Sequence, residues 1–292
     1  MYTSIESLVA LDKERGHPLW QVVLEEEMAL SGVSREQLWE QLRQRYHVMR
    51  ASAYRALDQA LPTVGNLISG VAKTHNAYAS QGNGLCGSFL NRVMAMALSC
   101  SEVNASMGKI CAAPTAGSCG ILPAVLVGLQ ERDNLSTDTI LEGLLVAGGI
   151  GAVITRNATV AGAEGGCQAE CGVAAAMAGA AAVHLQKGTV EQMVNAVCFA
   201  LMNVMGLVCD PVAGLVQVPC AQRNASQAVN ALLSADLALA GMQSIIPADQ
   251  VIEAMYRVGK MLPEQLRETG QGGIAATEKG REISHALFHP QE

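Results

Sequence analysis

The sequence is poor in aromatic and charged residues. Phe, Trp and Tyr make up 3% of its 292 residues, and Asp, Glu, Lys and Arg together make up 15%. The formal net charge is −7 and no basic run occurs, so nucleic-acid binding, which depends on clustered Lys and Arg, is not expected. Because 50% of the residues are hydrophobic and so few are aromatic, we expect a large core packed mainly by small side chains.

The sequence also has no apolar run long enough to cross a membrane. Its longest apolar segments, 171–183 and 194–208, are shorter than the roughly 20 residues that a spanning helix needs. The first residues contain Glu6 and lack the basic start and apolar run of a signal peptide. We therefore expect a cytoplasmic protein without a membrane segment, whose nine cysteines are not paired in disulfides.

Strand signals are nearly absent as well. Period-two alternation is hardly seen, and Gly-rich turns separate apolar segments that are too long for strands. The predicted fold class is mainly α, a compact multi-helix domain with Gly-rich functional loops, organised as a single domain over 1–292. The predicted helices are 86–99, 120–131, 137–154, 169–186, 190–208, 222–242 and 248–262.

Residues 1–60 are predicted to form a helical arm. This region holds many of the charges, and Ser34 with Gln37 has the pattern of a capping box. Apolar residues then recur every three or four positions as far as Leu57, which predicts an amphipathic helix. The arm could pack on the main body, residues 84–280, or on a partner.

Three cysteines stand out among the nine. Cys167, Cys209 and Cys220 each lie within two residues of a glycine or proline, where a thiolate can be held in a turn. No CxxC motif occurs, so a zinc ribbon or a ferredoxin pattern is not supported. Three thiolates form an incomplete cage for a cubane iron–sulfur cluster, which usually takes four cysteines. The remaining iron would be a Lewis acid with an open position.

The other cysteines have plainer explanations. From spacing alone, buried structural thiols remain the alternative even for the first three. Cys86, Cys100 and Cys198 fall at helical positions and are expected in the core. Cys171, four residues after Cys167, is the chief competitor for a fourth ligand position.

The loops contain further candidate site residues. Thr115, Ala116, Gly117 and Ser118 precede a predicted helix, where backbone N–H groups and two hydroxyls can bind a carboxylate; an ordinary helix cap is the alternative. The same two interpretations apply to Gly272 and Gly273. His75 is the only histidine near predicted loop chemistry and is a candidate general base.

Four segments together resemble a known family. They are EVNASMGKICAAPTAGSCG, NATVAGAEGGCQAECG, GLVCDPVAGLVQVPCAQRNA and RETGQGGIAAT, and they resemble the α subunit of the iron–sulfur-dependent L-serine dehydratases, in the family's order. The resemblance implies a [4Fe–4S] cluster held by Cys167, Cys209 and Cys220 within a cluster-binding core of residues 84–280. Cys171 falls on a position where the family often has an aliphatic residue. A separate β subunit is also implied, because the family's Ser-Ser-His-Thr-x-Gly-Pro motif is absent here.

The resemblance implies an L-serine ammonia-lyase. The open iron would bind the serine hydroxyl, a base would remove the α-proton, and loss of water would lead to pyruvate and ammonia. The candidate catalytic residues are His75, Thr115 and Ser118, and the candidate substrate-binding residues are Thr115, Ala116, Gly117, Ser118, Gly272 and Gly273. A histidine of the β subunit is an equal candidate for the base.

Two alternatives stay open. One is cluster-dependent elimination from cysteine or threonine in place of serine. The other is a non-catalytic subunit that carries a fully ligated cluster, with Cys171 as the fourth ligand. A pyridoxal-phosphate dehydratase is not favoured, because its lysine motif is missing.

Overall fold

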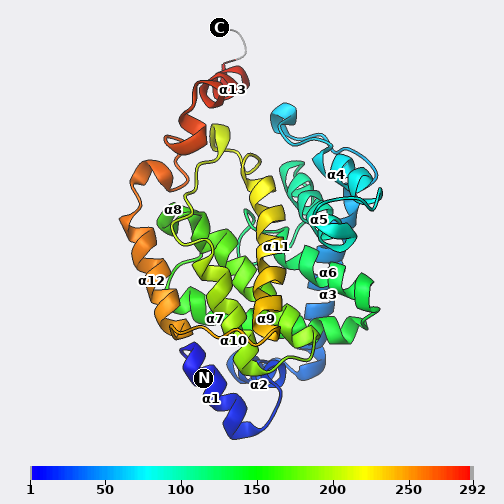
Figure 1. The fold of residues 1–292 in the computed structure, drawn as a ribbon, viewed down its shortest axis with the longest axis vertical. Helices are drawn as coiled ribbons and strands as arrows, with labels where there is room; N and C mark the ends of the chain where they lie inside the picture. The colour runs from blue at the N-terminus through cyan, green and yellow to red at the C-terminus, as the bar shows by residue number, and fades with distance from the viewer. Residues whose placement is uncertain (1, 290–292) are drawn as a thin grey trace.

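The computed structural model describes residues 2–289, and within them the chain is helical (Figure 1). The prediction of a mainly α, multi-helix fold is confirmed. The described residues form thirteen α-helices, which are α1 (Ile5–Arg15), α2 (Leu19–Ser31), α3 (Arg35–Arg55), α4 (Val71–Ala79), α5 (Gly87–Ala105), α6 (Ile121–Asp133), α7 (Thr137–Asn157), α8 (Gly162–Gly165), α9 (Val173–Leu185), α10 (Val190–Met202), α11 (Cys220–Leu239), α12 (Ala248–Met261) and α13 (Glu278–Phe288).

Short helical turns connect several of these elements. A π-helical turn, η2 (Gln168–Gly172), leads directly into α9, and four 3-10 turns lie in the loops. The 3-10 turns are η1 (Val64–Asn66), η3 (Val212–Gly214), η4 (Glu264–Leu266) and η5 (Gly273–Ala276).

Helix α9 lies at the centre of the molecule (Figure 1). It consists almost entirely of Ala, Gly, Val and Met, and each residue from Val173 to Val183 is buried. A helix that is apolar all round has no solvent face and must be covered on every side. Here α6, α7, α10 and α11 cover it. Small side chains allow close approach, since a β-carbon at Gly179 would lie 3.2 Å from the Ala231 carbonyl oxygen of α11.

The N-terminal arm, α1 to α3, packs against the main body. Helix α2 contacts α7, and α3 contacts α5 and α6. The predicted capping box at Ser34 is present: the Ser34 hydroxyl accepts from the Gln37 N–H, and the Gln37 side chain accepts from the Ser34 N–H. The structure therefore favours the main body as the surface on which the arm packs.

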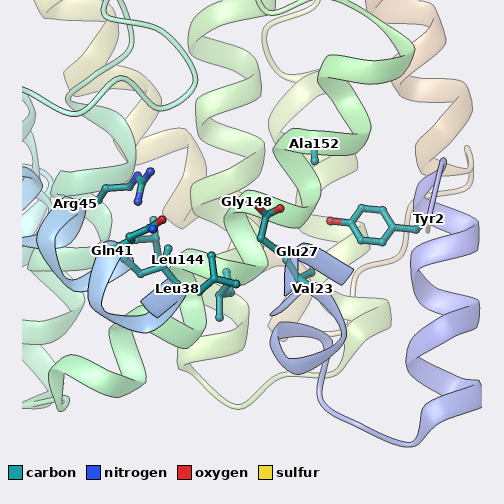
Figure 2. A pocket seen from close by; sticks show the side chains of 11 residues that line it. Tyr2, Val23, Glu27, Leu38, Gln41, Arg45, Leu144, Gly148 and Ala152 are labelled. Carbon is teal, nitrogen blue, oxygen red and sulfur yellow. The ribbon is translucent and has the colours of Figure 1, made fainter. Parts of the chain in front are cut away.

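A cavity lies at the seam between the arm and α7 (Figure 2). Its volume is about 200 Å³, and Glu27, Gln41 and Arg45 supply polar groups to its wall. None of the predicted site residues lines it. The cavity is thus a gap in arm packing and is separate from the chemistry expected of the chain.

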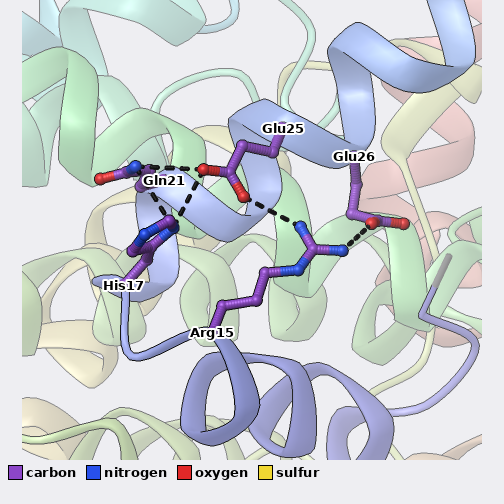
Figure 3. A network of polar contacts seen from close by, with 5 residues as sticks. All are labelled: Arg15, His17, Gln21, Glu25 and Glu26. Atoms are coloured by element: carbon purple, nitrogen blue, oxygen red, sulfur yellow. Dashed lines mark hydrogen bonds and ion pairs between the residues drawn. The ribbon is translucent and has the colours of Figure 1, made fainter.

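Surface ion pairs fix the turn between α1 and α2 (Figure 3). Arg15 Nη1 donates to Glu25 Oε2 at 3.0 Å, and its Nη2 donates to Glu26 Oε1 at 2.5 Å. His17 Nδ1 lies 3.0 Å from Glu25 Oε1. These pairs orient the turn, with Arg15 and Glu25 partly exposed and Glu26 buried.

Three sequence predictions need correction. The helix predicted over 86–99 continues to Ala105. The helix predicted over 190–208 ends at Met202, because a turn follows and Gly206 has a φ of +86°, which no α-helix contains. Cys86 was expected in the core, but it is exposed, since it lies at the N-cap of α5 where the chain turns at the surface. Cys100 and Cys198 are buried as predicted.

One helix among residues 2–289 is long and apolar enough to cross a membrane. This helix is α7, and 67% of its most apolar window is buried inside the protein. Its length and composition are those of a core helix as much as of a spanning one.

Candidate functional site

The predicted cysteine ligands lie where three loop segments meet. Cys167 is at the N-cap of η2, Cys209 lies in an extended segment after α10, and Cys220 is the first residue of α11. Backbone hydrogen bonds join these segments: the Gln168 N–H donates to the Leu207 carbonyl at 3.1 Å. The site is therefore built by residues far apart in the sequence.

Cys209 is also joined to the C-terminal loop. Its N–H donates to the Leu266 carbonyl at 2.8 Å, and its carbonyl accepts from the Glu268 N–H at 2.8 Å. This pairing forms an isolated parallel bridge with Arg267, the only bridge in residues 2–289. The bridge fixes the direction of the segment that carries the Cys209 thiol.

Two of the three cysteines and one carboxylate form a compact donor group. The ligand atoms of Cys167, Glu170 and Cys209 all lie within 4.8 Å of one another, and all three residues are buried. Glu170 follows Cys167 by three positions in the π-helical turn η2, a rare element that often occurs at functional sites. Glu170 was not among the candidates named from the sequence, although it lies in the segment NATVAGAEGGCQAECG. Its spacing of three from Cys167 places both side chains on one face of a helical turn.

Cys220 lies outside this group but close to it, since the charges of Cys167 and Glu170 act on its thiol. Burial, together with these charges, raises the pKa of the Cys220 thiol to about 12. Cys171 is also close, because it shares a hydrogen bond with Cys167. The structure thus brings a fourth thiol to the predicted ligands, and the question of a fourth cysteine ligand stays open.

A buried ion pair adjoins Cys167. Arg223 Nη1 lies 3.3 Å from the Cys167 Sγ and donates to the Val208 carbonyl at 2.8 Å, while its Nη2 donates to Asp210 Oδ1 at 2.7 Å. Hydrogen bonds from the Cys171 and Cys209 thiols, together with the Arg223 guanidinium, hold the pKa of Cys167 well below that of an ordinary thiol. Arg223 can therefore stabilise a thiolate at this position.

The predicted loop residues Gly272 and Gly273 are connected to the same ion pair. Asp210 Oδ2 accepts from the Ile274 N–H at 2.8 Å. Gly273 has a φ of +57°, and a β-carbon there would overlap the Asp210 side chain. A chain of contacts thus runs from Cys167 through Arg223 and Asp210 to this loop. Arg223 and Asp210 were not among the candidates named from the sequence, although both lie near cysteines in the segment GLVCDPVAGLVQVPCAQRNA.

The predicted anion-binding segment, Thr115 to Ser118, lies against Glu170. Thr115 Oγ1 donates to Glu170 Oε1 at 2.8 Å and lies 3.2 Å from Ser118 Oγ. Asn224 of α11 holds the segment, since its Nδ2 donates to the Gly117 carbonyl at 2.7 Å and its Oδ1 accepts from the Gly120 N–H at 2.8 Å. The segment enters α6 at Ile121, close to the predicted helix start.

Glu170 is the group on which this part of the site converges. The pKa of its carboxyl is raised to about 7, mainly by burial and also by the charges of Cys167 and Glu268, while the Thr115 hydrogen bond opposes the rise. Ala116 and Gly117 contribute backbone only, and a β-carbon at Gly117 would lie 3.1 Å from Glu170 Oε1.

His75 is not brought to these residues. It lies in α4, with its ring 6.0 Å from that of Tyr78 and a hydrogen bond to Asn91. Burial lowers its pKa, and its Nε2 has no hydrogen-bond partner within the described chain. None of its described contacts is with Cys167, Glu170 or Cys209.

Comparison with known proteins assigns the family. Residues 14–275 match the family model of the serine dehydratase alpha chain. The chain belongs to this family. It is 51% identical over 283 residues to the L-serine dehydratase alpha chain of Peptoniphilus asaccharolyticus, with 97% of each chain covered. It is 43% identical over 288 residues to the probable L-serine dehydratase alpha chain of Bacillus subtilis (strain 168), covering 99% of this chain and 96% of that one.

A longer relative has the same region within a larger chain. This chain is 35% identical over 284 residues to L-serine dehydratase 1 of Escherichia coli (strain K12), covering 94% of this chain but 61% of the relative. Serine dehydratase alpha chains thus correspond to part of some longer dehydratases.

The donor set of the site suits a metal centre. Buried thiols are soft ligands typical of iron–sulfur clusters, and the Arg223 guanidinium offsets the charge that they carry as thiolates. Such a group of buried cysteines could hold a metal cofactor.

Proposed function

We propose that this chain is the α subunit of an L-serine dehydratase that carries a [4Fe–4S] cluster on Cys167, Cys209 and Cys220. The observation that carries the proposal is the meeting of buried Cys167 and Cys209 at one site in a serine dehydratase alpha chain, with Cys220 close to it. The names of its relatives support L-serine as the substrate. In this proposal residues 1–292 form one catalytic domain and 84–280 form its cluster-binding core.

The reaction breaks the Cα–H and Cβ–O bonds of L-serine and releases water without net oxidation or reduction. The resulting enamine tautomerises and is hydrolysed to pyruvate and ammonia. When bound, the cluster supplies a Lewis-acidic iron that lowers the energy of the departing hydroxide. Thr115 and Ser118 bind substrate through their hydroxyls, and Arg223 holds the Cys167 thiolate in place.

The proton acceptor is proposed to come from a β subunit. The contacts of His75 are with Tyr78 and Asn91, away from the cysteines, so a base is needed from elsewhere. The greater length of L-serine dehydratase 1 of Escherichia coli supports a second part of the enzyme beyond this chain.

One observation favours a second candidate function, a non-catalytic subunit that carries a fully ligated cluster. Cys171 is buried and shares a hydrogen bond with Cys167, so a fourth thiol is within reach. In that case serine would have no iron to bind, and the partner chain would carry the chemistry.

The deciding experiment is anaerobic co-purification of this chain with its β subunit. Iron and sulfide are quantified, and keto-acid formation is assayed with L-serine, L-threonine and L-cysteine. We expect four irons and four sulfides per chain and pyruvate from L-serine as the main product. A complex with a full cluster and no lyase activity would support the non-catalytic subunit, and a preference for L-cysteine would change the substrate.

A further inference from the structure

Glu170 is a buried carboxylate without a cation. Its side chain is 8% exposed. Oε1 accepts one strong hydrogen bond, from Thr115 Oγ1 at 2.8 Å, and Oε2 has only the Cys209 thiol at 3.9 Å. A carboxylate offers about four acceptor positions, so most of its capacity is unused. No Lys, Arg or His among residues 2–289 forms an ion pair with it, whereas the equally buried Asp210 is paired with Arg223.

Negative charge gathers beside Glu170. The Cys167 Sγ, whose thiolate Arg223 can stabilise, lies within 4.8 Å of a Glu170 carboxylate oxygen. Arg223, the basic side chain at the cysteines, is already bonded to Cys167 and Asp210. A buried carboxyl in such a place either binds a proton or is stabilised as the carboxylate by a cation, so a positively charged ligand fits this site.

Two glycines let the backbone approach the carboxylate closely. A β-carbon at Gly162 would lie 2.6 Å from Glu170 Oε2 and 3.2 Å from the Cys209 Sγ. A β-carbon at Gly117 would lie 3.1 Å from Oε1. A larger residue at either position would press a side chain onto the carboxylate oxygens.

We propose that Glu170 binds the α-ammonium group of the amino-acid substrate. This inference rests on the proposed function. L-serine carries one cation, on the carbon that loses its proton, and an ammonium has three donors to share between Glu170 Oε2 and its neighbours. Glu170 thereby selects amino acids over hydroxy acids and places the substrate beside the cysteines and the Thr115 hydroxyl.

The test compares wild type with Glu170→Gln in the cluster-loaded complex with the β subunit. Glutamine keeps the size and can still accept from Thr115, but it loses the charge. The probe pair is L-serine and 3-hydroxypropanoate, which is serine with hydrogen in place of the ammonium. We expect the KM for L-serine to rise roughly 10- to 100-fold, since charge-assisted hydrogen bonds are lost, while the inhibition constant of 3-hydroxypropanoate changes less than about threefold.

Two readouts separate this role from a structural one. Iron and sulfide content, and the visible spectrum of the cluster, should match wild type in Glu170→Gln. The matched control is Glu164→Gln, which removes an exposed carboxylate six positions away that pairs with Lys260 at the surface and should leave the KM nearly unchanged.

Three results would overturn the inference. Loss of the cluster in Glu170→Gln would make Glu170 a group that acts on the cluster. A collapse of kcat at unchanged KM would make it a group that acts in the chemical step. Equal weakening of both ligands would mean that it does not recognise the ammonium. An inactive wild-type complex with a full cluster would instead refute the proposed function itself.

Discussion

The N-terminal arm and the cysteine site are built in different ways. In the arm, contacts between neighbours in the sequence set the start of α3 and the turn between α1 and α2: the Ser34 capping box and the Arg15 ion pairs each span 11 residues or fewer. At the site, the contacts that matter span 55 residues between Thr115 and Glu170 and 56 between Cys167 and Arg223. The arm should therefore tolerate substitutions that the site cannot.

The largest effect on cluster content and activity is expected from substitution of Cys167, Cys209 or Cys220. Serine at Cys167, Cys209 or Cys220 removes a soft ligand, and each variant should lose both the cluster and pyruvate formation. Iron and sulfide analysis of anaerobically purified protein measures this. Cys198→Ser and Cys86→Ser are the controls and should keep both nearly intact; a cluster retained in a variant at 167, 209 or 220 would remove that residue from the ligand set.

A smaller but substantial loss of folding stability is expected for Arg223→Gln. The substitution leaves Asp210 buried without its cation, and breaking a buried pair costs about 3–5 kcal/mol. Urea unfolding of the metal-free chain measures the loss, and hydrogen exchange should show faster opening of 266–274. Arg223→Lys keeps the positive charge but loses the planar set of N–H donors of the guanidinium, so its loss of unfolding free energy should be intermediate. Wild-type stability in Arg223→Gln would show that the pair is unimportant.

Gly273→Ala should destabilise more than Gly214→Ala. Both glycines have positive φ, which disfavours alanine by roughly 1 kcal/mol or more, but only at position 273 would the β-carbon overlap Asp210. The difference between the two variants in urea unfolding isolates the overlap. Equal losses of unfolding free energy in the two variants would mean that the loop can move away from Asp210 at no cost in stability.

The smallest effect is expected in the arm. Ser34→Ala removes the capping hydroxyl and should lower the free energy of unfolding by about 1 kcal/mol, with no change in iron content or in the KM for L-serine. Thermal unfolding and the serine assay together measure this. A loss of cluster in this variant would contradict the separation between arm and site.

The same difference explains what could be predicted from sequence. Helix positions depend on local caps and periodicity, so five of the seven helices predicted after residue 84 agree with the structure to within about four residues at each end. The helix predicted over 86–99 ends six residues before α5 does, and the one predicted over 190–208 ran on past a glycine with positive φ. The loops were found from their motifs. The roles of Glu170, Arg223 and Asp210 were not found, because each depends on a partner that only the folded chain brings near. His75 was proposed from the composition of its surroundings, and its role stays a prediction; its printed contacts are with Tyr78 of the same helix and with Asn91.

The most direct test of the central claim is a Mössbauer titration of the ⁵⁷Fe-loaded complex with L-serine. If Cys167, Cys209 and Cys220 hold three irons and leave the fourth accessible, one iron site in four should change its spectrum when L-serine binds. A cluster whose four iron sites stay unchanged at saturating L-serine, or a chain that takes up no iron, would contradict the account.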